Sequence, residues 1–136
     1  MPIEVKGMAP LLGVFDMPAS LHFYRDLLGF EVVGSSGPED NCGWCWLRLG
    51  GAELMLNTLY DKGERPAAVD PQRVKNHRDT AVYFSTPDVD ATYRYLREKG
   101  VEAEEPFDQN YGMRQCYVLD PDGYQLCFQW EVKASR

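Results

Sequence analysis

The stretch Met113–Trp130, MRQCYVLDPDGYQLCFQW, predicts two β-strands joined by a tight turn. Pro121 fixes φ at the second turn position, and Gly123 accepts a positive φ. Apolar side chains alternate with polar and aromatic ones on both sides of the turn. One face of the hairpin is therefore expected to join a core: Cys116, Val118, Leu126 and Phe128. The other face has the character of a binding-site wall: Gln115, Tyr117, Gln125, Cys127 and Gln129.

The composition of the 136-residue chain, with 44% hydrophobic and 26% charged residues, predicts a single globular domain over 1–136. The net charge of −7 argues against a nucleic-acid partner and is compatible with a cationic ligand. We expect no signal peptide and no membrane span, because no basic N-terminal region with a long apolar run, and no apolar run of about 18 residues, is present. Four cysteines without a secretory context favour the reducing cytoplasm.

The predicted strands and helices occur twice along the chain in the same order. A strand over 9–15, a helix that begins after Asp16 and ends at Gly29, and strands over 30–35, 44–49 and 52–59 make a first βαβββ module, at 8–59. A strand over 81–85, a helix that begins after Asp88 and ends at Gly100, a strand over 101–105 and the hairpin make a second, at 80–130. A shift of 72 places Ala9 on Ala81 and Met55 on Cys127, and such self-similarity indicates an internal repeat. The charged connector at 60–79 favours a solvated linker over a lid.

This pattern resembles the vicinal oxygen chelate superfamily, which includes glyoxalase I, extradiol dioxygenases, and fosfomycin and bleomycin resistance proteins. The matching residues are Ser20–Phe30, SLHFYRDLLGF, which are similar to the first helix of the family, and Tyr111–Arg114 leading into the Asp120–Gly123 turn. The resemblance implies an α+β fold in which two tandem βαβββ modules form a cup-shaped mixed sheet with the helices outside. It also implies a homodimer. Fold alone does not assign a chemistry in this superfamily.

Metal-dependent members of that family carry His or Glu at four strand positions. The resemblance places these positions on Ala9, Met55, Ala81 and Cys127, which do not form a ligand set for a hard cation. The prediction is therefore no metal and no cofactor, closest to the metal-free bleomycin-resistance-like branch. Displaced ligands such as Glu53 and His77 leave a metal-dependent lyase or dioxygenase as the alternative. His22 is expected to be solvated on its helix.

The Cys42-Gly43-Trp44-Cys45 motif has C-x-x-C spacing, but a strand follows it where a redox motif would have a helix. In an extended chain its two sulfurs would point to opposite faces. Cys116 and Cys127 are also expected on opposite faces of their hairpin. Packing and pocket lining are therefore favoured over redox or zinc chemistry.

The predicted cup interior is rich in aromatic and amide side chains, with one acid and one base. Such a surface suits an aromatic or cationic organic molecule, which would stack on rings and be oriented by amides. The expected ligand-binding residues are Trp44, Trp46, Arg48, Glu53, Met55, Asn57, Tyr83, Gln115, Tyr117, Gln125, Cys127 and Gln129.

Four functions follow from these patterns. The favoured one is a metal-free small-molecule binding protein, and the metal-dependent enzyme is its alternative. A metal-free enzyme would use Glu53 as general base near Arg48 or Tyr117. An interaction domain would instead associate through its sheet edges.

Overall fold

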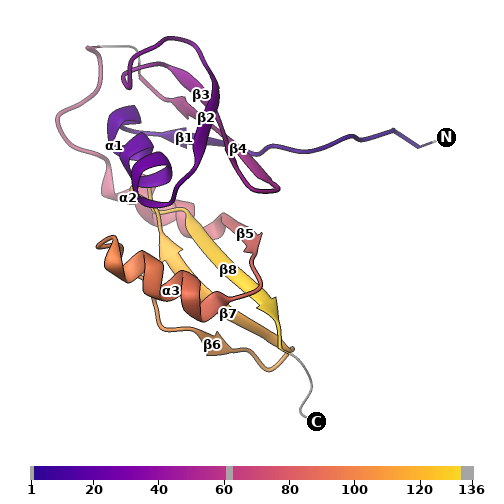
Figure 1. The fold of residues 1–136 in the computed structure, drawn as a ribbon. Helices are drawn as coiled ribbons and strands as arrows, with labels where there is room; N and C mark the ends of the chain where they lie inside the picture. Colours follow the sequence, from indigo (N-terminus) through magenta and orange to yellow (C-terminus); the bar gives the residue numbers. More distant parts are fainter. Residues whose placement is uncertain (1, 61–62, 133–136) are drawn as a thin grey trace. The chain divides into compact units, whose positions relative to one another are not determined.

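The structure is a computed structural model that describes residues 2–60 and 63–132. The chain divides into two compact units, residues 1–67 and residues 68–136. Each unit contains a four-stranded mixed sheet and helices (Figure 1). The predicted α+β class with two tandem βαβββ modules is therefore confirmed.

The first unit has the strand order β1-β4-β3-β2, with β1 parallel to β4 and the other pairs antiparallel. Its elements are β1 (Leu11–Val14), α1 (Met17–Leu21), the π-helix η1 (His22–Leu27), β2 (Glu31–Ser35), β3 (Trp44–Leu49) and β4 (Ala52–Thr58). The core lies between the helices and one face of the sheet, where these side chains are buried: Leu12, Val14, Met17, Leu21, Tyr24, Leu47, Leu54 and Leu56.

The first helical segment begins as predicted, because the Asp16 side chain accepts a hydrogen bond from the Ala19 backbone N–H at 3.3 Å. It continues as a π-helix, in which the Leu28 N–H donates to the Phe23 carbonyl. Gly29 then ends the segment with a φ of 94°. Apolar side chains at Met17, Leu21 and Tyr24 face the sheet, so the helix is held by the same core as the strands.

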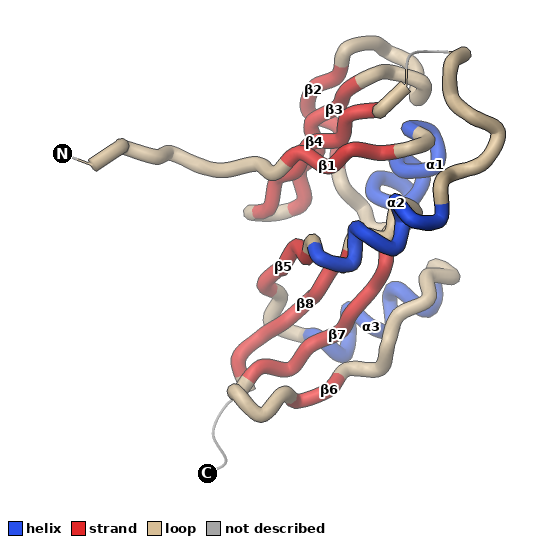
Figure 2. The backbone as a smooth tube through the Cα atoms, turned by 180° about the vertical axis from the view of Figure 1, so that it is seen from behind, coloured by secondary structure: helices blue, strands red, loops and turns tan. Residues whose placement is uncertain are grey.

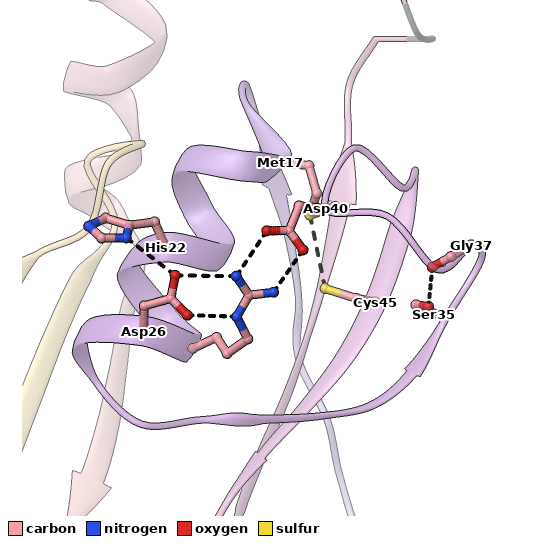
Figure 3. Close-up of polar contacts among 8 residues, drawn as sticks. Met17, His22, Asp26, Ser35, Gly37, Asp40 and Cys45 are labelled. Carbon is pink, nitrogen blue, oxygen red and sulfur yellow. Dashed lines mark hydrogen bonds and ion pairs between the residues drawn. The ribbon is translucent and has the colours of Figure 1, made fainter.

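The π-helix places Arg25 beside the loop between β2 and β3. The Arg25 guanidinium donates to both Asp40 carboxylate oxygens at 2.8 and 2.9 Å, and its Nε donates to Asp26 at 2.7 Å. Figure 3 shows Asp26 and Asp40 on two sides of this guanidinium. This contact lowers the pKa of both carboxyl groups. His22, 65% exposed at its side chain, contacts Asp26 at 3.3 Å, so the expectation of a solvated helix position holds.

The second unit has the equivalent order β5-β8-β7-β6, with β5 parallel to β8. Its elements are α2 (Pro71–Asn76), the 3-10 turn η2 (His77–Asp79), β5 (Ala81–Ser85), α3 (Val89–Glu98), β6 (Phe107–Asp108), β7 (Met113–Leu119) and β8 (Gln125–Glu131). Helix α3 lies against β7 and β8 (Figure 2). Its cap is the predicted one, since the Asp88 side chain accepts from the Ala91 N–H at 2.9 Å.

The internal repeat is visible in the strand pairing. Leu11 pairs with Met55 across β1 and β4, and Tyr83 pairs with Cys127 across β5 and β8. Both residues of the second pair lie 72 positions after those of the first (83 − 11 = 127 − 55 = 72), which matches the shift predicted from the sequence. Met55 and Cys127 therefore occupy the same register position in the two sheets.

Two predicted strands are placed wrongly. Ala9 precedes β1 instead of lying within the first strand. The strand expected over 101–105 is reduced to a single bridge between Ala103 and Val118, and β6 follows it at 107–108. Pro106 explains this shift, because a proline cannot donate a ladder hydrogen bond and interrupts the pairing.

The connector is not a solvated linker over its whole length, because α2 packs on the turn of the closing hairpin. Arg73 Nη1 lies 2.7 Å from Asp122 Oδ1, and this carboxylate is only 2% exposed. The His77 ring stacks on Tyr124 at 4.0 Å, while its Nδ1 lies 2.7 Å from the Asp122 carbonyl oxygen. Helix α2, the η2 turn and the hairpin turn are thus packed together within the second unit.

Candidate functional site

Each sheet has one face in the core of its unit and a second face that we call its open face. On the first sheet, β3 and β4 pair in a register that places Trp44 opposite Asn57, Trp46 opposite Met55, and Arg48 opposite Glu53. Their intervening neighbours Cys45, Leu47, Leu54 and Leu56 are fully buried on the other side. The predicted ligand-binding residues of the first module therefore share one surface, as alternation along the strands required.

Two tryptophans dominate this open face. The Trp44 and Trp46 rings meet edge to face, with centroids 6.4 Å apart. Gly34 on β2 lies beside both: a methyl group at its Cα would be 3.7 Å from Trp44 Cη2 and 3.8 Å from Trp46 Cβ. Gly34 therefore lies within ordinary van der Waals distance of both indoles, and together with Met55 the indoles form a half-buried apolar surface suited to stacking.

One polar atom on this face is without a protein partner. Trp46 Nε1 is buried and makes no hydrogen bond within the part of the chain that the structure describes. A buried donor without an acceptor costs about 1–3 kcal/mol.

The acid and the base of the predicted site lie together. Arg48 Nη2 is 3.4 Å from Glu53 Oε1, with side-chain exposures of 53% and 31%. Glu31 is the register partner of Arg48 on the neighbouring strand β2, so the cross-strand row contains two acidic residues and one basic residue. An exposed pair of this kind contributes at most about 1 kcal/mol, which leaves Glu53 and Arg48 free to exchange partners with a ligand.

The open face of the second sheet is built from tyrosines and glutamines. Tyr117 and Tyr111 both donate to Gln115 Oε1 at 3.1 Å, and the Tyr83 hydroxyl lies 3.2 Å from that of Tyr117. Gln115 Nε2 in turn donates to Gln129 Oε1 at 2.9 Å.

Two of the predicted ligand-binding residues are on this face but are not accessible. Gln115 is 2% exposed and Cys127 is 0% exposed. Cys127 pairs with Tyr83 on one side and Tyr117 on the other, and their longer side chains shield it. Gln115 acts instead through the phenols that it orients.

Two exposed aromatic residues of the same face were missed by the sequence analysis. Phe107 pairs with Gln115 and is 63% exposed, and Tyr111 is also 63% exposed. Phe107 escaped notice because the strand was expected at 101–105. Tyr111 precedes Gly112 in a turn, where strand alternation gives no signal.

Two predicted orienting amides bond to the backbone. Gln125 Nε2 donates to the Arg78 carbonyl at 2.7 Å, and Asn57 Nδ2 donates to the Thr58 carbonyl at 3.1 Å. Of the amides predicted to orient a ligand, Gln129 is bonded only through its side-chain oxygen in the contacts described above. Its amide group is therefore the better placed donor.

The positions that the family resemblance assigned to metal ligands hold no donor set. Met55 is half-buried on the first open face and Cys127 is buried on the second, while Ala9 and Ala81 have no donor side chain. Among the described residues, no three His, Cys, Asp or Glu side chains gather in one place. Of the proposed displaced ligands, Glu53 pairs with Arg48, and His77 is stacked on Tyr124 with its Nδ1 against a carbonyl oxygen.

Cys42 lies in the loop before β3 and Cys45 lies within the strand, and both side chains are buried. The expectation of opposite faces assumed an extended chain over both cysteines, so it does not apply to this pair. It holds for Cys116 and Cys127, which face opposite sides of their sheet. Burial raises the pKa of Cys45 to about 12, so it is a poor nucleophile near neutrality.

Comparisons with solved structures find the same fold. A glyoxalase/bleomycin resistance protein/dioxygenase from Nocardioides aligns at a TM-score of 0.71 and 21% identity over 99% of this chain and 89% of that one. A bleomycin-binding protein in complex with bleomycin aligns at 0.70 and 21% identity over 93% and 99%. SMU.1112c aligns at 0.67 and 26% identity over 93% and 100%. No curated protein matches the chain.

Within the described residues, no helix has both the length and the apolar character needed to cross a bilayer. The profile of one protein family matches residues 8–128, which include both modules and nearly the whole chain. With the repeated βαβββ units, this match shows that the chain belongs to the glyoxalase/bleomycin resistance protein/dioxygenase superfamily.

Proposed function

We propose that this protein binds a small aromatic or cationic organic molecule without a metal ion, as a binding protein and not as an enzyme. The observation that carries the proposal is the character of the two open faces. They present indoles, phenols and amides, and the four positions that would carry metal ligands are Ala9, Met55, Ala81 and Cys127. Stacking on such rings supplies about 0.5–1.5 kcal/mol per contact beyond area burial.

Two further features support the charge preference in this proposal. The chain carries a net charge of −7, which attracts cations over long distances. The row formed by Glu31, Arg48 and Glu53 has an excess of one carboxylate beside the tryptophans. A cation stacked on Trp46 would meet Glu53, which its weak pairing with Arg48 leaves available.

Binding to a panel of aromatic amines, carboxylates and neutral compounds tests the proposal, read by tryptophan fluorescence and thermal shift. We expect saturable binding that raises the melting temperature and is unchanged by chelator or added divalent metal. Trp44→Ala should weaken it several-fold. Trp130→Phe is the control, because Trp130 is 40% exposed but pairs with Arg114 on the opposite face of its own sheet.

The metal-dependent alternative makes the opposite prediction. Under it, protein purified without chelators would contain a stoichiometric first-row metal and would turn over an oxo-aldehyde or a catechol. Glu53→Ala would abolish that metal content. Such a result would overturn the metal-free proposal.

The proposal also includes a homodimer in the cytoplasm. Sheet edges support association, since β1 and β2 border the first sheet and β5 and β6 the second. Four free, buried cysteines support a reducing compartment. Light scattering of the purified protein tests the homodimer, and a monomer mass would contradict it.

A further inference from the structure

The tyrosine–glutamine network of the second sheet has a fixed hydrogen-bond direction. A phenol has one O–H to donate and lone pairs to accept, whereas an amide oxygen only accepts. Gln115 Oε1 accepts from both Tyr111 and Tyr117, each at 3.1 Å. The hydrogens of these two phenols therefore point into the protein.

In the contact between the Tyr83 and Tyr117 hydroxyls, only one of the two can then be the donor. Tyr83 and Tyr117 hydroxyls are 3.2 Å apart, and distance alone does not say which one donates. Because the Tyr117 hydrogen is already directed to Gln115, Tyr83 must donate to Tyr117. Tyr83 has then used its hydrogen as well.

The two exposed phenols consequently present only acceptors to the outside. Tyr83 is 50% exposed and Tyr111 is 63% exposed as whole residues, so both side chains are open to a ligand from solvent. The exposed ring of Phe107 lies on the same face, paired with Gln115. Aromatic faces attract cations, and none of these side chains carries a formal charge that would repel one.

We propose that Tyr83 and Tyr111 form a binding site for an organic cation with N–H donors, such as a protonated amine or an amidinium group. This inference rests on the proposed small-molecule binding and narrows its ligand class. The N–H groups would donate to the two phenol oxygens, and the ring of the ligand would pack on Phe107. Carboxylates and phosphates are disfavoured, because their oxygens are hydrogen-bond acceptors and would face phenol oxygens that also only accept.

Four probes that share one ring and differ in the head group test the inference: benzamidine, benzyltrimethylammonium, benzyl alcohol and benzoate. Calorimetry and amide NMR titration of the whole protein would measure affinity and location. We expect benzamidine to bind best, with shifts at the amides of Tyr83 and Tyr111. Benzyltrimethylammonium keeps the charge but has no N–H donor, so it should bind about tenfold more weakly or less. Benzoate should not bind.

Substitutions separate the hydrogen bonds from the ring. Tyr83→Phe and Tyr111→Phe each remove one acceptor, and each should weaken benzamidine several-fold while leaving benzyltrimethylammonium unchanged. Tyr95→Phe is the matched control, because Tyr95 is a surface tyrosine of α3, 39% exposed. Gln115→Glu keeps an acceptor for both phenols and should preserve the preference for benzamidine. Gln115→Leu releases the phenol hydrogens and should erase the preference. Circular dichroism confirms that each variant is folded.

The possible results distinguish the two proposals. Equal binding of benzamidine and benzyltrimethylammonium, or no effect of either tyrosine substitution, overturns this inference. If probes then still quench tryptophan fluorescence through Trp44, the proposed function survives without it. If no probe and no member of the wider panel binds, both proposals fail.

Discussion

Substitution of Gly123 by alanine should detach α2 from the hairpin turn. Gly123 has a φ of +87°, and an added methyl group would overlap the Val74 carbonyl oxygen and lie 2.8 Å from Val74 Cγ1. The Val74 carbonyl belongs to the backbone, so it cannot move aside in the way that the end of a flexible side chain can. The helix must therefore shift, and the contacts of Arg73 and His77 with the turn must loosen with it.

The expected loss of stability has three parts. A left-handed backbone costs a non-glycine residue about 1–2 kcal/mol. Displacing packed atoms costs a further 1–3 kcal/mol or so. The reduced entropy of the unfolded chain returns about 0.4–1 kcal/mol. The free energy of unfolding should therefore fall by about 1–4.6 kcal/mol, with a central value near 3 kcal/mol.

The internal repeat supplies two controls. Gly50 also has a positive φ, +56°, but an added methyl group would contact nothing within 4 Å; Gly51 has neither restriction. Gly50→Ala should therefore cost about 1 kcal/mol or less, and Gly51→Ala should be close to neutral. Urea unfolding followed by far-UV circular dichroism gives the three free energies, and limited proteolysis before residue 71 reports release of α2. A Gly123→Ala protein within about 0.5 kcal/mol of Gly50→Ala, with unchanged proteolysis, would refute this reasoning.

Three further predictions concern charge and thiols. Arg73→Met should lower the free energy of unfolding by about 3 kcal/mol, because it removes the cation that pairs with the buried Asp122 carboxylate. Urea denaturation measures this loss. Arg48→Met, at an exposed ion pair, is the control. Arg114 holds the pKa of Asp90 below 3.8, so the stabilisation from this ion pair is present above pH 3.8 and is lost as the pH falls through the lowered pKa. A carboxyl NMR titration of Arg114→Met should show the pKa of Asp90 returning toward 3.8. An unchanged pKa would contradict the assignment to Arg114. Burial raises the pKa of Cys116 and Cys127 to about 11 and that of Cys45 to about 12. These three thiols should therefore react slowly with Ellman's reagent at pH 8 in the folded protein and rapidly in denaturant. Fast reaction of the three thiols in the folded protein would contradict their burial.

Local patterns were sufficient for most of the fold. Asp16 and Asp88 cap their helices as predicted, because capping depends on residues three positions apart. The alternation in β3, β4, β7 and β8 correctly separated core and open faces, since strand side chains point to opposite sides in turn. The pairing of β1 with β4 recurs 72 positions later as the pairing of β5 with β8, which agrees with the shift found in the sequence.

Contacts between distant residues were outside the reach of local patterns. Arg73 and Asp122 are 49 positions apart, and nothing in the connector signals that a carboxylate of the hairpin turn will anchor it. Likewise, the alternation in β8 put Cys127 on the open face but could not show that Tyr83 and Tyr117 shield it. The size of neighbouring side chains on adjacent strands decided accessibility, and a single strand does not contain that information.

The difference between Met55 and Cys127 bears on the proposal that this protein works without a metal ion. They occupy one register position in two sheets, yet Met55 remains half-exposed beside Trp46, whereas Cys127 lies fully buried between two tyrosines. A carboxylate introduced at position 127 would be desolvated among neutral phenols, and burial would favour its protonated form. Restoring ligands by substitution would therefore also require removal of the tyrosine–glutamine network. On the metal-free proposal, that network opposes a metal centre at this position as much as the missing ligands do, and its phenol oxygens fit the proposed recognition of an N–H donor.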